Sequence, residues 1–395
     1  MQNFVLARVA RLTCQLRQLA REDVLHNMAW DFETDPEYAS TLAWVDQFVS
    51  EEVEPLDHVL GSPFDNSDRR ARAAVRPLER RVLDRGLWAA HLGPELGGQG
   101  FGQLKLALLN EILGRSRWAP SVFGCQAPDS GNAEILARFG TPEQKTRYLQ
   151  PVLDGEVTSC YSMTEPHAGA DPRLFTTTAV RDGSHWVING EKWFSSNARY
   201  ASFLIVIAVT NPNVDPHKSM SMFVVPTDTP GVEIVRNVGV GTEPESVATH
   251  AYLRYTDVRV PHDALLGAEG AAFAVAQTRL GGGRIHHAMR TIAQVRRAFD
   301  MLCERAVSRK TRSGSLGALQ ATEDAIAEAG SRSSSFGYSS CGPHGSSTST
   351  RTTRPCGRTS PLSRRPCRRS SARSCSGLCT STERWESPTR CRSAR

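Results

Sequence analysis

The sequence predicts a multidomain α+β protein with an N-terminal α-helical domain, a middle antiparallel β-barrel or sandwich, and an incomplete C-terminal helical bundle. Apolar residues recur at three- and four-residue steps as far as about residue 157, which is typical of amphipathic helices. Short runs of β-branched and aromatic residues, separated by turn residues, follow from residue 158 to residue 264. The helical period then returns. This order favours separate domains over alternating strand and helix units.

Residues 1–27 are predicted to be a disordered extension ahead of the first domain. The segment is rich in arginine, which would also suit a targeting peptide. Glu22 and Asp23, together with the lack of a long apolar run, argue against that alternative.

Residues 28–157 are predicted to form the N-terminal helical domain. The apolar positions of Leu42–Val53 form one stripe, with acidic residues between them. A second helix is expected over about Asp68–Arg85. A third, over Leu104–Leu113, is apolar nearly all round and should therefore be buried. The segment Thr141–Gln144 begins another helix, because Thr is a preferred N-cap, Pro suits the first position and Gln can close a capping box.

Residues 158–264 are predicted to form the β domain. The expected strands are 176–180, 185–188, 203–209, 221–226, 232–235 and 252–260. Turn clusters at Asp182–Ser184, Asn189–Gly190 and Pro230–Gly231 separate neighbouring strands. Because no helices intervene, the spacing favours an antiparallel barrel or sandwich.

Residues 265–329 are predicted to begin the C-terminal helical domain. A long helix is expected over Ile285–Arg309, with one apolar side. The run Gly281–Gly283 is interpreted as a flexible segment that leads into this helix.

Charge and cysteine content divide the chain at about residue 330. Residues 330–395 contain 13 arginines, no lysine and two acidic residues, so the formal net charge of +6 belongs to this tail and residues 1–329 are net negative. The basic character therefore says nothing about the partners of the body. Six of the 10 cysteines lie in the tail, and the other four form no disulfide framework and no paired metal spacing, which suggests a reducing cytoplasm. No apolar run approaches the roughly 20 residues of a membrane span.

Two polar stretches carry the strongest functional signal. Tyr161–Pro172 and Asn189–Asn197 combine hydroxyl groups, backbone amides at Gly and Pro turns, and aromatic rings. Such a set suits a flat, redox-active ring that forms hydrogen bonds along one edge. A single fragment of either stretch would be only a turn, so the signal depends on the joint order of several motifs.

Together with Pro94–Gly98, Gly140–Lys145 and Arg309–Thr311, these two stretches resemble the acyl-CoA dehydrogenase family over about residues 28–329. The segment Trp193–Ser196 is most similar to the branch of larger members whose animal homologues carry an extra kinase-like region. The resemblance implies FAD as cofactor, an acyl-CoA substrate, and electron-transfer flavoprotein or a similar acceptor as partner. It also implies a homodimer or homotetramer, with no metal and no membrane.

The resemblance implies a set of cofactor-binding residues as well. In the family, the segment that matches Tyr161–Thr164 lies along the flavin ring. Ala170 stands where the family often has Ser, Phe194 where it has Trp, and Ser196 where it has Thr. The residues implied for the cofactor are Tyr161, Met163, Thr164, Ala170, Phe194, Ser195, Ser196 and Arg309.

Two arginines implied by the resemblance come from the C-terminal part. Arg309 matches an arginine that reaches the flavin diphosphate of the neighbouring subunit in the family, a charge-assisted contact. Arg284 matches an arginine near the catalytic pocket, and it is assigned with Ala170 to the substrate pocket.

The chemistry implied is α,β-dehydrogenation of an acyl-CoA thioester, in which a base removes the α-proton and the flavin takes the β-hydride. One alternative is a flavin oxidase or monooxygenase on the same fold, which oxygen consumption with an acyl-CoA would favour. The other is a non-catalytic flavin-binding remnant with a basic, nucleic-acid-binding tail, which salt-dependent binding of DNA or RNA would favour. We do not expect nucleic acid among the partners.

Residues 330–395 are predicted to be an out-of-frame, disordered tail. Beyond Ala329 the periodicity stops; a basic arm and a low-complexity linker are the other interpretations. When each codon is read from its third base, Ala329–Gly345 permits an amphipathic helix and Gly377–Arg392 permits a family-like glycine-rich turn. In the family the catalytic carboxylate follows on a late loop. We therefore expect no catalytic residue in this chain and an impaired activity.

Overall fold

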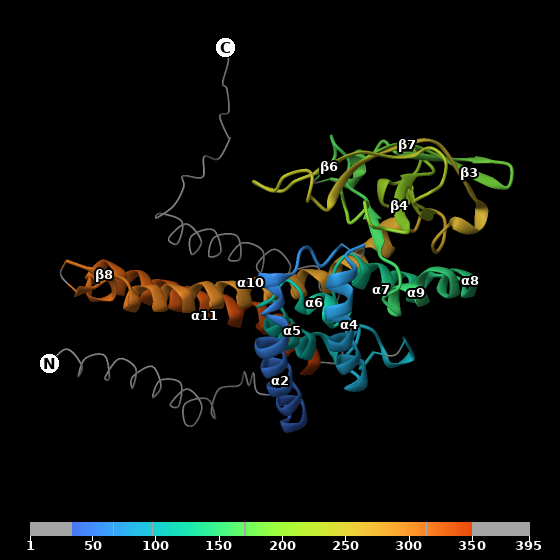
Figure 1. Cartoon of the computed structure of the whole chain (residues 1–395). Helices are drawn as coiled ribbons and strands as arrows, with labels where there is room; N and C mark the ends of the chain where they lie inside the picture. Colours follow the sequence, from blue (N-terminus) through green and yellow to red (C-terminus); the bar gives the residue numbers. More distant parts are fainter. Residues whose placement is uncertain (1–33, 66, 97, 170, 313, 350–395) are drawn as a thin grey trace, which may run out of the picture.

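The computed structural model describes residues 34–65, 67–96, 98–169, 171–312 and 314–349 (Figure 1). A helical domain, a sheet and a long pair of helices follow one another along the chain, and the pair extends away from the other two parts (Figure 1). The predicted order of helices, strands and helices is confirmed. The predictions for residues 1–27 and 350–395 concern segments outside the described residues.

The N-terminal domain is built from short helices around one apolar core. They are α2 (Pro36–Phe48), continued by the π-helical turn η1 (Val49–Val53), α3 (Leu56–Val59), α4 (Arg69–Asp84), η2 (Pro94–Leu96), α5 (Gly102–Leu113), α6 (Ala119–Val122), α7 (Asp129–Phe139), α8 (Pro142–Gln144), η3 (Lys145–Leu149) and α9 (Gln150–Leu153). The predicted stripe is buried at Val45, Phe48 and Val53. The predicted capping box is present, because the Thr141 hydroxyl accepts the Gln144 N–H at 3.2 Å and the Gln144 side chain accepts the Thr141 N–H at 3.1 Å.

The middle domain is one mixed sheet. Its strands are β1 (Ser159–Ser162), β2 (Thr178–Asp182), β3 (His185–Ser196), β4 (Phe203–Val209), β5 (Met220–Pro226), β6 (Val232–Val238) and β7 (His250–Pro261). They follow the order β1-β4-β2-β3-β7-β6, with β5 paired to β4 and a further pairing of β1 with β3. The domain is sandwich-like and not a closed barrel. The predicted sandwich is confirmed and most strand pairs are antiparallel, but the sheet is mixed, because β1 runs parallel to β4. A parallel pair needs a long crossover, which strand patterns alone do not reveal.

The pair Asn189–Gly190, predicted to be a turn, lies inside β3 at a shift in the register with β7. A β-bulge accounts for the turn-like residues, because it bends a strand without ending it. Gly190 has a φ of 144°, and a Cβ there would lie 2.6 Å from the Cα of Thr177. The glycine is therefore required by close contact between two chain segments.

The C-terminal part is a pair of antiparallel helices, α10 (Ala272–Ser308) and α11 (Gln320–Ser349), joined by a hairpin of β8 (Lys310–Thr311) and β9 (Gly314–Ser315). The long helix begins at Ala272 and not at Ile285. The prediction of a flexible segment at Gly281–Gly283 is therefore wrong. Tertiary packing overrides the helix-breaking tendency of glycine, because buried residues such as Val275 and Met289 anchor both flanking turns.

The backbone of α11 remains helical beyond residue 330, as far as Ser349, where the sequence predicts a disordered tail. Local bonds support these turns. Arg332 pairs with Glu328 one turn earlier, and the Ser333 hydroxyl donates to the carbonyl of Ala329 at 2.7 Å. The prediction of disorder is therefore wrong for residues 330–349.

Strand β4 places the sheet between two apolar cores. Phe203, Ile205 and Ile207 pack against α7 and the first turns of α10, whereas the alternate residues Leu204 and Val206 face the interior of the sandwich. All five are 2% exposed or less. The sheet is therefore held rigidly against helices from both other parts of the chain.

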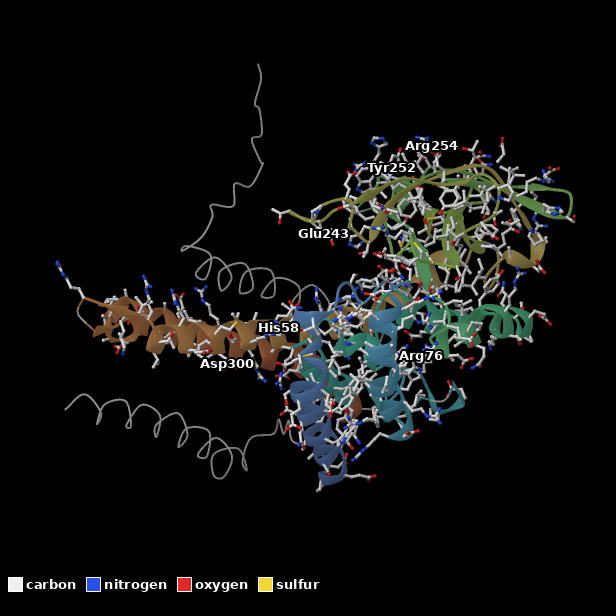
Figure 2. The ribbon with its side chains drawn as sticks, viewed as in Figure 1. His58, Arg76, Glu243, Tyr252, Arg254 and Asp300 are labelled. Carbon is white, nitrogen blue, oxygen red and sulfur yellow. The ribbon has the colours of Figure 1, made fainter. Side chains whose placement is uncertain are left out.

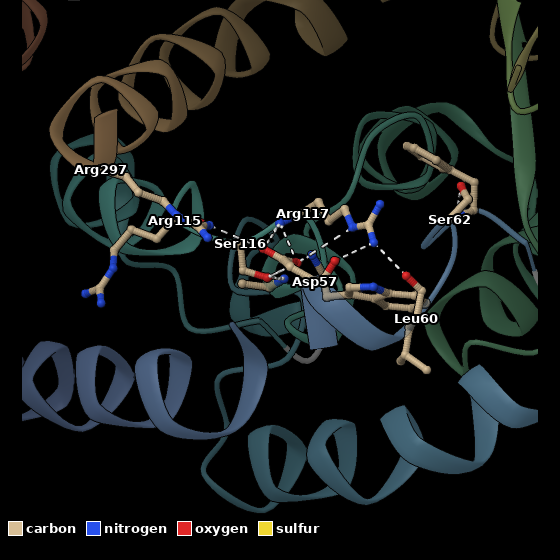
Figure 3. Close-up of polar contacts among 10 residues, drawn as sticks. Asp57, Leu60, Ser62, Arg115, Ser116, Arg117 and Arg297 are labelled. Atoms are coloured by element: carbon tan, nitrogen blue, oxygen red, sulfur yellow. Dashed lines mark hydrogen bonds and ion pairs between the residues drawn. The ribbon is translucent and has the colours of Figure 1, made fainter. Parts of the chain in front are cut away.

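A polar network around Asp57 fixes α10 to the helical domain (Figure 3). The Asp57 carboxylate accepts the Ser116 hydroxyl at 2.9 Å and lies 3.4 Å from Nη1 of Arg297, a residue of α10. Arg297 also donates to the carbonyl of Arg115 at 2.6 Å, and Arg117 donates to the carbonyl of Asp57 at 2.7 Å. The loop after α5 is thus hydrogen-bonded to Asp57 of the helical domain and to Arg297 of α10.

Candidate active site

The two polar stretches singled out in the sequence lie side by side. Tyr161, in β1, is paired with Ser196 at the end of β3. One step further, the N–H of Trp193 donates to the carbonyl of Thr164 at 2.8 Å. The predicted cofactor-binding segments therefore form one continuous wall at the ends of these two strands.

Three groups on this wall have the features of a site for a flat polar ring. The hydroxyl of Tyr161 is buried and has no hydrogen-bond partner in the described part of the chain. Among the same residues, no backbone or side-chain acceptor is bonded to the N–H of Thr164. Phe194 has a 47% exposed side chain and a φ of 54°, a conformation that is rare outside glycine. Unpaired donors and an exposed ring fit a flavin.

The two serines of β3 differ in where their hydroxyl groups lie. Ser195 is 1% exposed, and its oxygen lies 3.0 Å from that of Ser162, inside the sheet. Ser196 is half-buried, and its hydroxyl oxygen lies 2.9 Å from Nδ1 of His250. Burial lowers the pKa of His250. The side chain of Ser196 is thus closer to the solvent side of the wall than that of Ser195.

Aromatic side chains continue from Phe194 across the outer face of the sheet. Trp193 lies 5.5 Å from Phe194 and 4.9 Å from Tyr252, measured between ring centroids. Tyr252 and Arg254 lie on the side of the sheet that faces away from the helical domain (Figure 2). Arg254 bridges the carboxylates of Glu191 and Glu233, at 3.2 Å from each.

A buried ion pair behind the wall was not predicted from the sequence. Lys192 is 0% exposed and Glu165 4%, and the Lys192 ammonium lies 2.9 Å from both the Glu165 carboxylate and the carbonyl oxygen of Met163. Burial lowers the pKa of Lys192 to about 8. Burial alone would raise the pKa of Glu165, but the charge of Lys192 and the N–H of Thr176 lower it.

A second unpredicted network joins the wall to both helical parts. The Arg279 guanidinium, from α10, lies 3.7 Å from the centroid of the Tyr161 ring. Its Nε donates to the Asn132 side chain at 3.0 Å, and Asn132 donates to the Ser159 hydroxyl at 2.8 Å. The carboxylate of Asp129 accepts the N–H and the hydroxyl of Ser159. No sequence motif marks this network, because its members come from three distant segments.

The remaining predicted residues lie elsewhere. Ala170 is outside the described residues. Arg284 lies on α10 beyond Arg279; its Nε is buried without a partner among the described residues, and one terminal nitrogen lies 3.5 Å from Gln277. Arg309 caps the end of α10, with an exposed side chain. At 1.5 Å per residue, it lies about 45 Å along the helix from Arg279. Strand β8, which follows Arg309 directly, lies at the tip of the helical pair, away from the sheet (Figure 1).

A hollow of about 120 Å³ lies in the helical domain, between α4, α7 and α9. His91 and Asp129 line it, but none of the predicted site residues does. Across the described ranges there is no cluster of three or more potential metal-ligating side chains. No helix among the same residues combines the length and apolarity required to span a bilayer.

A helical domain, a sandwich-like mixed sheet and a long helical pair define the acyl-CoA dehydrogenase fold. The structure of a Mycobacterium abscessus protein assigned as an acyl-CoA dehydrogenase has this fold, with a TM-score of 0.76 and 30% sequence identity over 88% of this chain and 90% of that one. A glutaryl-CoA dehydrogenase from Mycobacterium smegmatis in complex with FADH2 shares the fold, with a TM-score of 0.70 and 22% identity over 88% and 85% of the two chains.

The chain belongs to the acyl-CoA dehydrogenase family. The family profiles described as acyl-CoA dehydrogenase N-terminal, middle and C-terminal domain match residues 35–156, 160–258 and 270–334. The chain is 42% identical to the probable acyl-CoA dehydrogenase FadE2 of Mycobacterium tuberculosis, over 64% of each protein. It is 36% identical to acyl-CoA dehydrogenase family member 11 of Gallus gallus, over 75% of this chain but only 39% of that protein. It thus spans less than two thirds of both relatives, and the animal relative is a larger protein.

Proposed function

We propose that this chain is an FAD-dependent oxidoreductase that acts on the CH–CH bond next to the thioester of an acyl-CoA. Family membership supports this proposal, and the observation that carries it is the wall of Tyr161, Thr164 and Phe194, with its unpaired donors and exposed ring. When bound there, FAD would supply the hydride acceptor for the reaction. The protein supplies position and electrostatics.

Each residue of the wall has a distinct part in the proposed site. The amide of Thr164 and the hydroxyl of Tyr161 would donate hydrogen bonds to the polar edge of the ring. Phe194 would pack against a ring face, since it remains 47% exposed beside Trp193 and His250. Ser196 would hold a proton near the ring through the contact with His250. Because β1 and β3 are paired, Tyr161, Phe194 and Ser196 are held in register, and the N–H of Trp193 fixes the carbonyl of Thr164 in the loop after β1.

A second copy of the chain would complete the proposed site. Arg309 lies too far along α10 to reach the wall of its own chain, so it can serve a cofactor only in a neighbouring subunit. We therefore propose a homodimer or homotetramer, with electron-transfer flavoprotein or a similar protein as electron acceptor. Both parts of this proposal follow from the family resemblance, and a measurement of the mass of the assembly in solution tests the first.

The proposal includes an impaired turnover. A shifted reading frame would place the segment after residue 330 out of phase and replace the late helices that precede the family's catalytic carboxylate, so we propose that this chain carries no such base. The loss of a general base removes several orders of magnitude in rate. The nucleotide sequence across codons 328–332, with its downstream frames, tests this directly. If no other frame there continues a helical, family-like protein, the proposed frameshift is wrong.

The function itself is tested by adding FAD and a series of acyl-CoA thioesters to the purified chain. We expect the flavin to bind, and its visible band to be perturbed when acyl-CoA is added, while turnover with an artificial electron acceptor stays low. A chain that leaves free FAD unperturbed would contradict the proposed cofactor. Oxygen consumption without reduction of the acceptor would instead favour an oxidase.

A further inference from the structure

The buried pair of Lys192 and Glu165 contacts the cofactor wall from behind. The Lys192 ammonium donates to the carbonyl oxygen of Met163 at 2.9 Å, and that carbonyl belongs to the peptide unit whose N–H is the unpaired amide of Thr164. In a trans peptide the C=O and the N–H point in opposite directions. A cation on the carbonyl side therefore fixes the amide on the other side, toward the wall.

We propose that Lys192 is a positioning residue that orients and polarises the 163–164 peptide, so that the Thr164 amide donates to the polar edge of the bound flavin. The inference rests on the proposed cofactor. It assigns a function to a buried charge that contacts the wall only from behind, at the carbonyl of Met163.

The Lys192 side chain is enclosed by protein, so its charge does not contact solvent. The side chain is 0% exposed, and its ammonium lies 4.4 Å from the centroid of the Phe175 ring. Glu165 is fixed in turn, because its second oxygen accepts the N–H and the hydroxyl of Thr176 at 2.7 and 2.9 Å. A buried pair of this kind is a poor source of stability compared with apolar residues of the same volume, so packing alone does not explain its presence.

Polarisation gives the pair a way to act on a ligand. Hydrogen bonds in a chain strengthen one another in a low-dielectric interior. An ammonium that withdraws charge from the carbonyl of Met163 makes the N–H of Thr164 a stronger donor. The second anchor is the N–H of Trp193, which holds the carbonyl of Thr164 at 2.8 Å. The loop thus has two fixed carbonyls, those of Met163 and Thr164, and no acceptor among the described residues is bonded to the N–H of Thr164.

The test compares the full-length chain with the double variant Lys192→Met/Glu165→Gln, which removes both charges together and leaves no unpaired buried ion. The matched control is Arg259→Met/Asp182→Asn, because Arg259 and Asp182 form an ion pair on the same sheet but are 52% and 60% exposed. Each flavin-free protein is titrated with FAD. The visible spectrum and the midpoint potential of the bound flavin are then recorded.

We expect the Kd for FAD to rise about tenfold in the Lys192→Met/Glu165→Gln variant, which corresponds to one lost hydrogen bond. The midpoint potential should become more negative, because a weaker donor stabilises the electron-rich reduced ring less. The control should match the wild type in both. If the flavin bound to the double variant has the wild-type spectrum and potential, the pair is merely structural and the inference fails while the cofactor proposal stands. If the wild type binds no FAD, both fail.

Discussion

At the scale of single residues, burial of Asp129 in the fold makes the stability of the protein depend on pH. Its carboxylate accepts the N–H and the hydroxyl of Ser159 at 2.7 and 2.5 Å. Burial raises the pKa of Asp129 to about 6, against the partial opposing effect of these two bonds. In the unfolded chain an aspartate titrates near pH ~4. Between about pH 4 and 6 the folded protein therefore binds a proton that the unfolded chain has released, so this residue lowers the stability as the pH rises.

Replacing Asp129 by Asn should remove that loss. The shift of about two pKa units corresponds to about 3 kcal/mol at most, and because Asp129 also lines the hollow of the helical domain we expect about 2 kcal/mol. The free energies of unfolding of the two proteins should coincide near pH 4, and the D129N variant should be more stable by pH 7. Denaturant titrations of both proteins at a series of pH values measure this difference. Contributions from other titrating groups, such as His91, are common to the two proteins and cancel. A difference that does not change with pH would contradict the assignment.

The candidate site shows which residues a sequence can predict and which it cannot. Tyr161, Thr164 and Phe194 belong to contiguous motifs, and the motifs are enough to identify the family. Lys192 and Arg279 are equally close to the wall, but they act through partners far away in the chain, Glu165 and Tyr161. Lys192 lies within the stretch Asn189–Asn197, but the local sequence does not show whether its side chain is exposed or buried. Only the register of β3 shows that this position faces the interior.

At the scale of elements, glycines decide how closely helices and strands approach. Strand and helix periodicity predicts most elements, but the same patterns predict breaks at the glycines of α10 and β3, where the structure has none. In both cases the packing of neighbouring residues decides the conformation, and a local pattern does not contain that information. The parallel pairing of β1 with β4 cannot be predicted from a local pattern either, since the two strands are far apart in sequence.

The crossing of α5 and α10 gives a direct test of this view. A Cβ on Gly114, at the end of α5, would lie 2.5 Å from the Cα and 2.6 Å from the carbonyl oxygen of Arg290. Since both are backbone atoms of a packed helix, Gly114→Ala should destabilise the protein by about 3 kcal/mol. A Cβ on Gly281, inside α10, would have no heavy atom of another described residue within 4 Å. There, Gly281→Ala should stabilise by about 0.5–1 kcal/mol.

Thermal denaturation of the two glycine variants beside the wild type provides the measurement. The two melting temperatures should move in opposite directions. Stabilisation by Gly114→Ala would mean that the helices do not approach as closely as the structure shows. Destabilisation by Gly281→Ala would mean that the glycine run is not helical.

At the scale of the whole molecule, the three parts share one core and one polar network. The apolar cluster that includes Leu136, Ile205 and Val275 takes residues from α7, the sheet and α10. Asn132 joins the same three parts with hydrogen bonds, since it contacts Ser159 of β1 and Arg279 of α10. Parts that are joined in both ways should unfold together.

Removing the Asn132 side chain should weaken that coupling more than it weakens any one part. Asn132 is 0% exposed, and Asn132→Ala leaves the Nε of Arg279 without its acceptor and the Ser159 hydroxyl without one donor, which we expect to lower the free energy of unfolding by about 3 kcal/mol. Calorimetry should show one cooperative transition for the wild type and a van't Hoff enthalpy below the calorimetric enthalpy for the variant. The control is Arg138→Ala on the same helix. The Arg138 side chain is 60% exposed and pairs with Glu134 at the surface, so this variant should lose less than about 0.5 kcal/mol of unfolding free energy. If the two variants lose the same stability and both unfold in one transition, the network does not couple the three parts, and the shared apolar core alone holds them together.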